Sequence, residues 1–144
     1  MATPQVGYVL KQAQSLLRLR MEEALKPLQL TVSQYSCLHL LRQEPGISAE
    51  GLARGTFVTR QSMNVLVQAL ERDGYVTRPT QAPVGKVLPT ALTPRGRRSL
   101  DKASAAVRSV EVQMLSGLTQ DDRSQALTSL RSMVQALHDV DGNS

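Results

Sequence analysis

The stretch TRQSMNVLVQALERDGYVTR, residues 59–78, decides the fold. Its apolar side chains recur at i, i+3, i+4 and i+7, the spacing of one buried helix face: Met63, Leu66, Val67 and Leu70. The opposite face carries mostly short or amide side chains: Gln61, Asn64, Val65, Gln68 and Arg72, with Arg60 and Ser62 at its margins. Asp73-Gly74 ends the pattern, and the β-prone residues 75–78 follow. The stretch therefore predicts a half-buried helix with a polar outer face, followed by a strand.

Three helices are predicted before this one, over residues 6–25, from Thr31 to about Gln43, and from Ser48 to about Gly55. Pro27 ends the first because a proline ring cannot continue a helix. Thr31 and Gln34 form the capping box T-x-x-Q at the start of the second. Ser48 caps the third. These three closely spaced helices precede the helix after Thr59 in a small helical module.

A β-hairpin and two helices are predicted after it. Residues 75–78 and 87–92 form the hairpin strands, and Pro89 keeps the second strand at an edge or irregular. Thr93-Pro94 opens a helix with a coiled-coil-like seam, whose members are Leu100, Ala103, Val107, Val110 and Met114. Leu118-Thr119 begins the last helix, which frays after His138.

Positive charge is concentrated in the middle of the chain. The net charge is +5, from 17 basic and 12 acidic residues. Residues 48–98 hold eight basic and three acidic residues, which leaves nine of each elsewhere, and residues 74–100 hold no acidic residue. This segment therefore presents positive potential to a polyanion. A basic surface that serves only solubility remains the alternative.

Several classes of protein are disfavoured. The 144 residues suit a single domain, and one cysteine with two histidines cannot supply a disulfide framework or a Cys/His zinc site. Cys37 and His39 point about 200° apart on their helix, so they cannot act together as nucleophile and base. The sequence also shows no signal for a membrane span, a signal peptide or a glycine-rich phosphate loop. We expect a cytoplasmic protein without cofactor, metal or catalytic activity.

The order of elements favours a winged helix-turn-helix that binds duplex DNA. The major groove admits one helix, and amides pair with adenine edges while an apolar side chain meets a thymine methyl. We expect base contacts from Gln61, Ser62, Asn64, Val65 and Gln68, and base or phosphate contacts from Arg60, Arg78 and Lys86. An ordinary solvated helix face is the alternative for the amides.

The terminal helices predict a second subunit. Both ends of the chain carry apolar stripes too long for the central module to cover, so two copies are expected to cover each other. The expected dimer contacts are Leu10, Leu17, Leu100, Val107, Val110 and Leu130. The fold class is thus mainly α (α+β), a winged helix-turn-helix over 30–93 with a dimerisation region over 1–29 and 94–144 that forms an interlocked homodimer. A monomer with its ends folded back is the alternative.

The sequence resembles the MarR family of bacterial transcription regulators over nearly its whole length. The matching residues are Leu30-Thr31, Gln34-Tyr35, Leu38, Leu52-Ala53, Val58-Thr59, Met63, Leu66-Val67, Leu70-Glu71, Asp73 to Val76, Leu92-Thr93, Gly96 and Leu100. The resemblance implies homodimers on a pseudo-palindromic operator, usually repressors that a phenolic ligand or an oxidant releases. It also implies that the helix after Thr59 is the recognition helix.

Two departures and one extension accompany the resemblance. Many relatives carry Asp-x-Arg at the wing, whereas residues 80–86 here hold no acid and only Lys86, and a tryptophan typical of the urate-responsive branch is missing. Lys11, Arg18 and Arg20 are candidates for binding a small anionic aromatic effector, or are simply solvated charges.

Cys37 is expected to pack as a small hydrophobe. It lies six residues past the Thr31 cap, where neither a helix N-terminus nor a close cation would lower its pKa. Two other functions remain open for the whole chain: a non-specific nucleoid protein that coats DNA, and a protein-interaction dimer with a vestigial basic surface.

Overall fold

The computed structural model describes residues 5–78 and 90–142, with the side chains of 140–142 left out. The chain forms two compact units, residues 1–110 and 111–144. The first contains α1 (Val6–Leu25), the 3-10 helix η1 (Lys26–Leu28), α2 (Val32–Gln43), α3 (Ala49–Thr56), α4 (Arg60–Arg72), β1 (Val76–Thr77) and β2 (Ala91–Leu92). It also holds most of α5 (Pro94–Met114), and the second unit holds α6 (Gln120–Gly142).

Hydroxyl side chains set the starts of these helices. Thr31 and Gln34 form the predicted capping box, with Thr31 N donating to Gln34 Oε1 and Gln34 N to Thr31 Oγ1, both at 3.0 Å. Ser48 accepts from Gly51 N, and Thr93 accepts from Gly96 N. Thr119 forms a second capping box with Asp122. Each start lies where the sequence predicts it because each cap acts within three residues.

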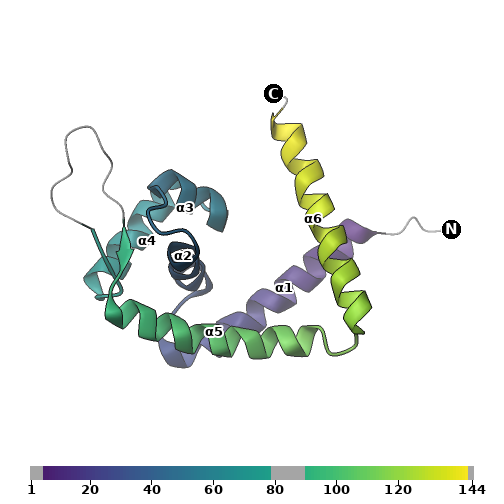
Figure 1. The fold of residues 1–144 in the computed structure, drawn as a ribbon, viewed down its shortest axis with the longest axis horizontal. Coiled ribbons are helices and arrows are strands. Elements are labelled where there is room, and N and C mark those ends of the chain that lie inside the picture. The colour runs from purple at the N-terminus through teal and green to yellow at the C-terminus, as the bar shows by residue number, and fades with distance from the viewer. Residues whose placement is uncertain (1–4, 79–89, 143–144) are drawn as a thin grey trace. The chain divides into compact units, whose positions relative to one another are not determined.

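The core of the first unit lies around α2. This helix contacts α1, α3, α4 and β2, and Figure 1 shows it nearly end on among them. The fully buried side chains at the centre come from each of α1 to α5: Leu25, Cys37, Leu38, Leu52, Met63, Leu70 and Leu100. Burying a side chain of this size stabilises by about 1.5–3 kcal/mol, so this cluster stabilises the first unit.

Within the described residues, the hairpin consists of β1 and β2, which pair antiparallel with Val76 opposite Leu92 and Thr77 opposite Ala91. The predicted tip and the beginning of the second strand, including Lys86 and Pro89, lie outside the described residues.

Two helix ends differ from the expectation. Pro27 ends α1, but the chain continues for one 3-10 turn with Pro27 in it, because a proline fits the first turn of a helix. The last helix continues past His138 to Gly142, the first glycine after its start.

Candidate nucleic-acid interface

The polar face of α4 is supported by a buried apolar face. Thr59 caps the helix, its Oγ1 accepting from Ser62 N at 3.0 Å and donating to Ser62 Oγ at 2.9 Å. Met63, Val67 and Leu70 are buried in the core. The core thus fixes the rotation of α4 about its own axis, and with it the side that faces outward.

All the residues of α4 that the sequence selects for DNA are exposed: Arg60, Gln61, Ser62, Asn64, Val65 and Gln68. The amides each offer a donor and an acceptor, as an adenine edge requires. Val65 is 64% exposed and so offers an apolar side chain on the same face as the amides. Among the ion pairs of residues 5–78 and 90–142, none involves Arg60.

The hairpin base is tied to the end of α4. Arg78 is half-buried, and its Nη2 lies 3.4 Å from Oε1 of Glu71 on α4. Arg95 Nε donates to the carbonyl oxygen of Asp73 at 3.1 Å, and its guanidinium lies 5.0 Å from the ring centre of Tyr75. The sequence analysis assigned Arg78 to DNA and did not predict its ion pair with Glu71. The signal for this pair is an acidic residue at the end of α4, seven residues before Arg78.

Thr93 closes the same base. Its Oγ1 donates to the carbonyl oxygen of Gly74 at 2.6 Å, and its backbone N–H donates to that of Tyr75 at 3.1 Å. Gly96 packs so closely that a Cβ there would lie 2.0 Å from the oxygen of Tyr75. The hairpin therefore leaves the module at a fixed place beside α4.

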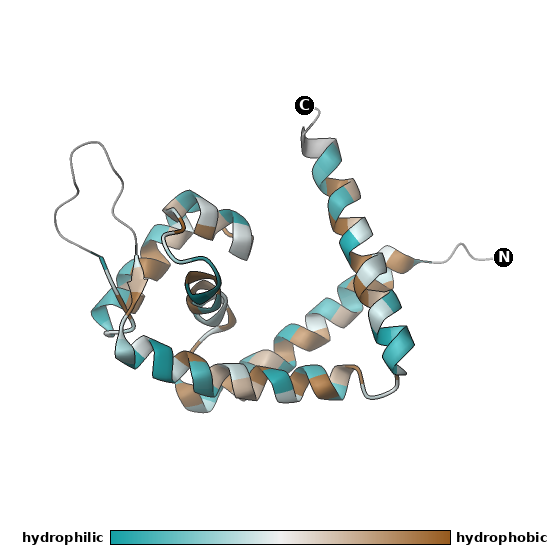
Figure 2. Cartoon of the chain, in the orientation of Figure 1, coloured by the Kyte–Doolittle hydropathy of each residue, from teal (hydrophilic) through white to brown (hydrophobic). Residues whose placement is uncertain are grey.

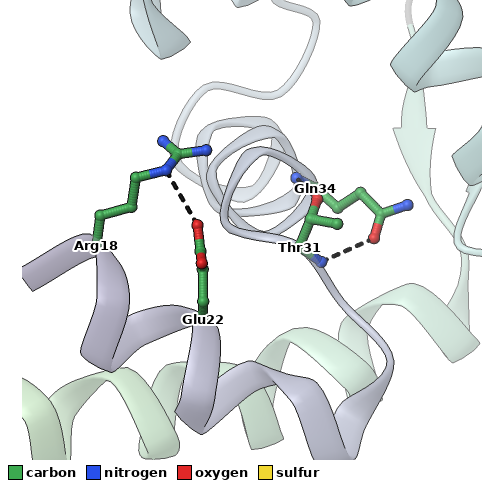
Figure 3. Close-up of polar contacts among 4 residues, drawn as sticks. All are labelled: Arg18, Glu22, Thr31 and Gln34. Atoms are coloured by element: carbon green, nitrogen blue, oxygen red, sulfur yellow. Dashed lines mark hydrogen bonds and ion pairs between the residues drawn. The ribbon is translucent and has the colours of Figure 1, made fainter. Parts of the chain in front are cut away.

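The effector candidates lie in different surroundings. Arg18 lines a hollow of about 430 Å³ between α1 and the start of α2, together with Glu22, Lys26, Gln29, Leu30, Thr31 and Val32. Arg18 Nε donates to Glu22 Oε1 at 3.1 Å at its rim, as Figure 3 shows. Lys11 lines a separate hollow of about 400 Å³ on α1. Arg20 lines neither and pairs with Glu23 at 3.1 Å.

Lys26 was missed by sequence reasoning, which took its effector candidates from the basic residues of the first helix. Lys26 lies directly after that helix, in the 3-10 turn. Its position before Pro27 is the signal in the sequence for a turn there.

The expected dimer contacts also divide. Leu10 and Leu130 are 42% and 43% exposed, and Leu17 is half-buried. Leu100 and Val110 are instead buried, and Val107 packs against the core of its own chain. The α5 seam thus packs within its own chain at Leu100, Ala103 and Val107, whereas Met114 at its end is 49% exposed. Apolar residues also recur along α1 and α6 (Figure 2), and several of them are exposed.

Cys37 is fully buried, and its Sγ lies 3.9 Å from Sδ of Met63 on α4. Burial raises the pKa of its thiol to about 11. Within residues 5–78 and 90–142, no group of side chains could hold a metal ion, and no helix is long and apolar enough to cross a membrane.

The helix pair α3–α4, its exposed polar face and the following hairpin define a winged helix-turn-helix protein. A sequence profile of the MarR family matches residues 28–86. The chain is 41% identical over 114 residues to the HTH-type transcriptional repressor Rv2887 of Mycobacterium tuberculosis. This match covers 79% of this chain and 82% of that protein. The chain therefore belongs to the MarR family and is a transcriptional regulator.

Solved structures agree with this assignment. Rv2887 in complex with DNA is similar with a TM-score of 0.76 and 36% identity, covering 92% of this chain and 98% of that one. Rv2887 in complex with salicylic acid has a TM-score of 0.74 and 37% identity, covering 92% and 97%. The transcriptional repressor CouR bound to a 23-mer DNA duplex has a TM-score of 0.81 and 28% identity, covering 90% and 92%.

Proposed function

We propose that the chain binds double-stranded DNA as a homodimer and represses transcription at a pseudo-palindromic operator in the bacterial cytoplasm. The observation that carries this proposal is the exposed, amide-bearing face of α4 above the buried Met63, Val67 and Leu70. The relatives support it, because Rv2887 and CouR are both named repressors and both have been solved with DNA.

In this proposal α4 enters the major groove. Gln61, Ser62, Asn64, Val65 and Gln68 contact bases, while Arg60, Arg78 and Lys86 contact bases or phosphates. Two modules related by a two-fold axis read two half-sites whose centres lie about one helical turn apart. The dimer therefore determines the spacing of the site, and α4 determines its sequence.

Selection of bound duplexes from a random pool by the purified protein tests this function. A regulator should recover a pseudo-palindrome and prefer it over random duplex by at least about 10³. Binding without such a preference would favour a DNA-coating protein, and binding without salt dependence would contradict a role on DNA.

We further propose that a small aromatic carboxylate occupies the hollow between α1 and α2 and weakens DNA binding. Arg18, Lys26 and Glu22 give this hollow a net charge of +1, and Thr31 and Val32 add the positive end of the α2 dipole. An aromatic monoanion matches that charge, and Rv2887 has been solved with salicylic acid.

Thermal melting with salicylate tests the effector site. Salicylate at 100 times its Kd should stabilise the folded chain by about 2.7 kcal/mol. Lys26→Gln should reduce that shift, while Arg20→Gln should leave it unchanged because Arg20 lies outside the hollow. Equal shifts in both variants would place the ligand elsewhere.

A further inference from the structure

Phe57 combines two unfavourable features in the turn between α3 and α4. Its side chain is 87% exposed. Its backbone is left-handed, with φ of 59°, as the C-cap of α3. A bulky aromatic side chain is disfavoured in this region because its Cβ crowds the carbonyl oxygen. Phe57 therefore occupies a position where a glycine or asparagine would be more stable.

The other left-handed positions of the described residues are Gln29, Gly46 and Gly74, and none of them exposes a large apolar side chain. Gly46 and Gly74 have no side chain to strain, and Gln29 is polar and solvated. Val58, the next residue, packs against the core and fixes the turn, so Phe57 is directed away from the core. The exposed phenyl ring thus contributes little to the stability of the isolated chain.

The position of the turn indicates what Phe57 contacts. Phe57 precedes the Thr59 cap by two residues, and α4 begins at Arg60. The N-terminal end of a recognition helix is the part that meets base edges. Arg54 and Arg60 lie on either side of Phe57 in the chain and suit neighbouring phosphates. Phe57 therefore lies in the turn that leads directly into the proposed DNA-reading helix.

We propose that Phe57 contacts the C5-methyl group of a thymine at the edge of each half-site. This inference rests on the proposed function, since it requires α4 in the major groove. The thymine methyl is the apolar group that the major groove offers, and phenylalanine is among the side chains that meet it. The phenyl ring is exposed in the free chain, and a thymine methyl that covers it would remove apolar surface from water.

The test compares Phe57→Gly with the wild-type chain on the operator recovered by selection. We expect the variant to lose about tenfold in affinity for that operator. Its melting temperature should not fall, because glycine relieves the left-handed backbone. The slope of affinity against salt should not change, because no phosphate contact is removed. Phe57→Leu keeps an apolar side chain and should stay within about threefold of the wild type.

Replacing single thymines by uracil, which lacks the methyl group, identifies the contact. The wild type should lose affinity at one position per half-site, and Phe57→Gly should lose nothing further there. Phe57→Leu is the matched control: it keeps an apolar side chain and should still lose affinity on the same uracil duplex as the wild type. Equal binding of the operator by Phe57→Gly and the wild type would overturn the proposal. So would a difference in affinity between the two proteins that stays the same on every uracil duplex. Failure to select any operator would instead overturn the proposed function.

Discussion

Gly96 is the residue on which the hairpin base depends most. A Cβ at this position would lie 2.0 Å from the carbonyl oxygen of Tyr75, an atom of the backbone that cannot move aside easily. We expect Gly96→Ala to destabilise the chain by about 3 kcal/mol, measured by urea unfolding. Gly7→Ala is the control, because a Cβ at Gly7 meets nothing within 4 Å and should be neutral or slightly stabilising. Equal stability of the two variants would contradict the close packing at Gly96.

Cys37 makes stability depend on pH in the alkaline range. Burial raises the pKa of its thiol from 9.0 to about 11, so the folded chain favours the neutral thiol more than the unfolded chain does. This contribution is present in full below pH 9 and is lost as the pH rises through 11. Relative to Cys37→Ala, the wild type should therefore lose about 3 kcal/mol across this range.

Denaturant unfolding of both proteins at a series of pH values measures this difference. Parallel stability curves would show that the thiol ionises as it does in the unfolded chain. The same buried thiol should leave operator affinity insensitive to peroxide, because oxidation needs an exposed thiolate. Release of DNA by peroxide in the wild type, but not in Cys37→Ser, would make Cys37 a sensor.

Single residues divide into those that the sequence predicts and those that it does not. The outward face of α4 follows from the spacing of Met63, Val67 and Leu70, because helix geometry converts spacing into direction. Lys26 and Phe57 were missed. Their surroundings depend on a 3-10 turn and on a left-handed backbone, and neither leaves a periodic signal.

At the scale of elements, the ion pair between α4 and the hairpin base bears on the positive charge that this region would offer to DNA. Glu71 lies 3.4 Å from Arg78, and this partly exposed pair offsets part of the charge of Arg78. Glu71→Gln should therefore raise DNA affinity several-fold at low salt and steepen the salt dependence by about one phosphate contact. Titrations at several salt concentrations measure both quantities.

Glu23→Gln is the control for this experiment. Glu23 pairs with Arg20 on α1 and lies outside the α4–hairpin region. The variant adds the same charge to the chain, so it should change affinity less and leave the slope unaltered. An equal effect of both variants would mean that only net charge matters, and that Arg78 does not contact phosphate.

For the whole molecule, the exposed stripe on α6 is the sharpest test of the dimer. Leu127, Leu130, Val134 and Leu137 are spaced by three or four residues and are 43–72% exposed. Leu130→Lys with Leu137→Lys should dissociate the dimer and abolish operator binding, measured by sedimentation and DNA titration. Ser132→Lys adds charge on another face of α6 and should leave the dimer intact. A double variant that stays dimeric would show that α6 is not the interface.

The sequence predicted the helices of the whole molecule better than their partners. Thr31, Thr59 and Thr119 mark helix starts locally, so tertiary contacts are not needed to find them. The seam at Leu100 was assigned to a second subunit, yet Leu100 is buried in the core of its own chain. A stripe of apolar residues predicts that a helix face is buried, but it does not identify the element or subunit that packs against that face. Only the structure identifies that partner.

The closed base of the hairpin has a consequence for how this regulator could diversify. Thr93 and Gly96 hold the backbone of Gly74 and Tyr75 directly, so the two ends of the segment between the strands are anchored independently of what joins them. Loop-closure entropy then sets the cost of changing that segment, and doubling its length costs only about 0.6 kcal/mol. Insertions and substitutions between the strands should therefore cost the fold little, which leaves this segment freer to evolve than the helix beside it.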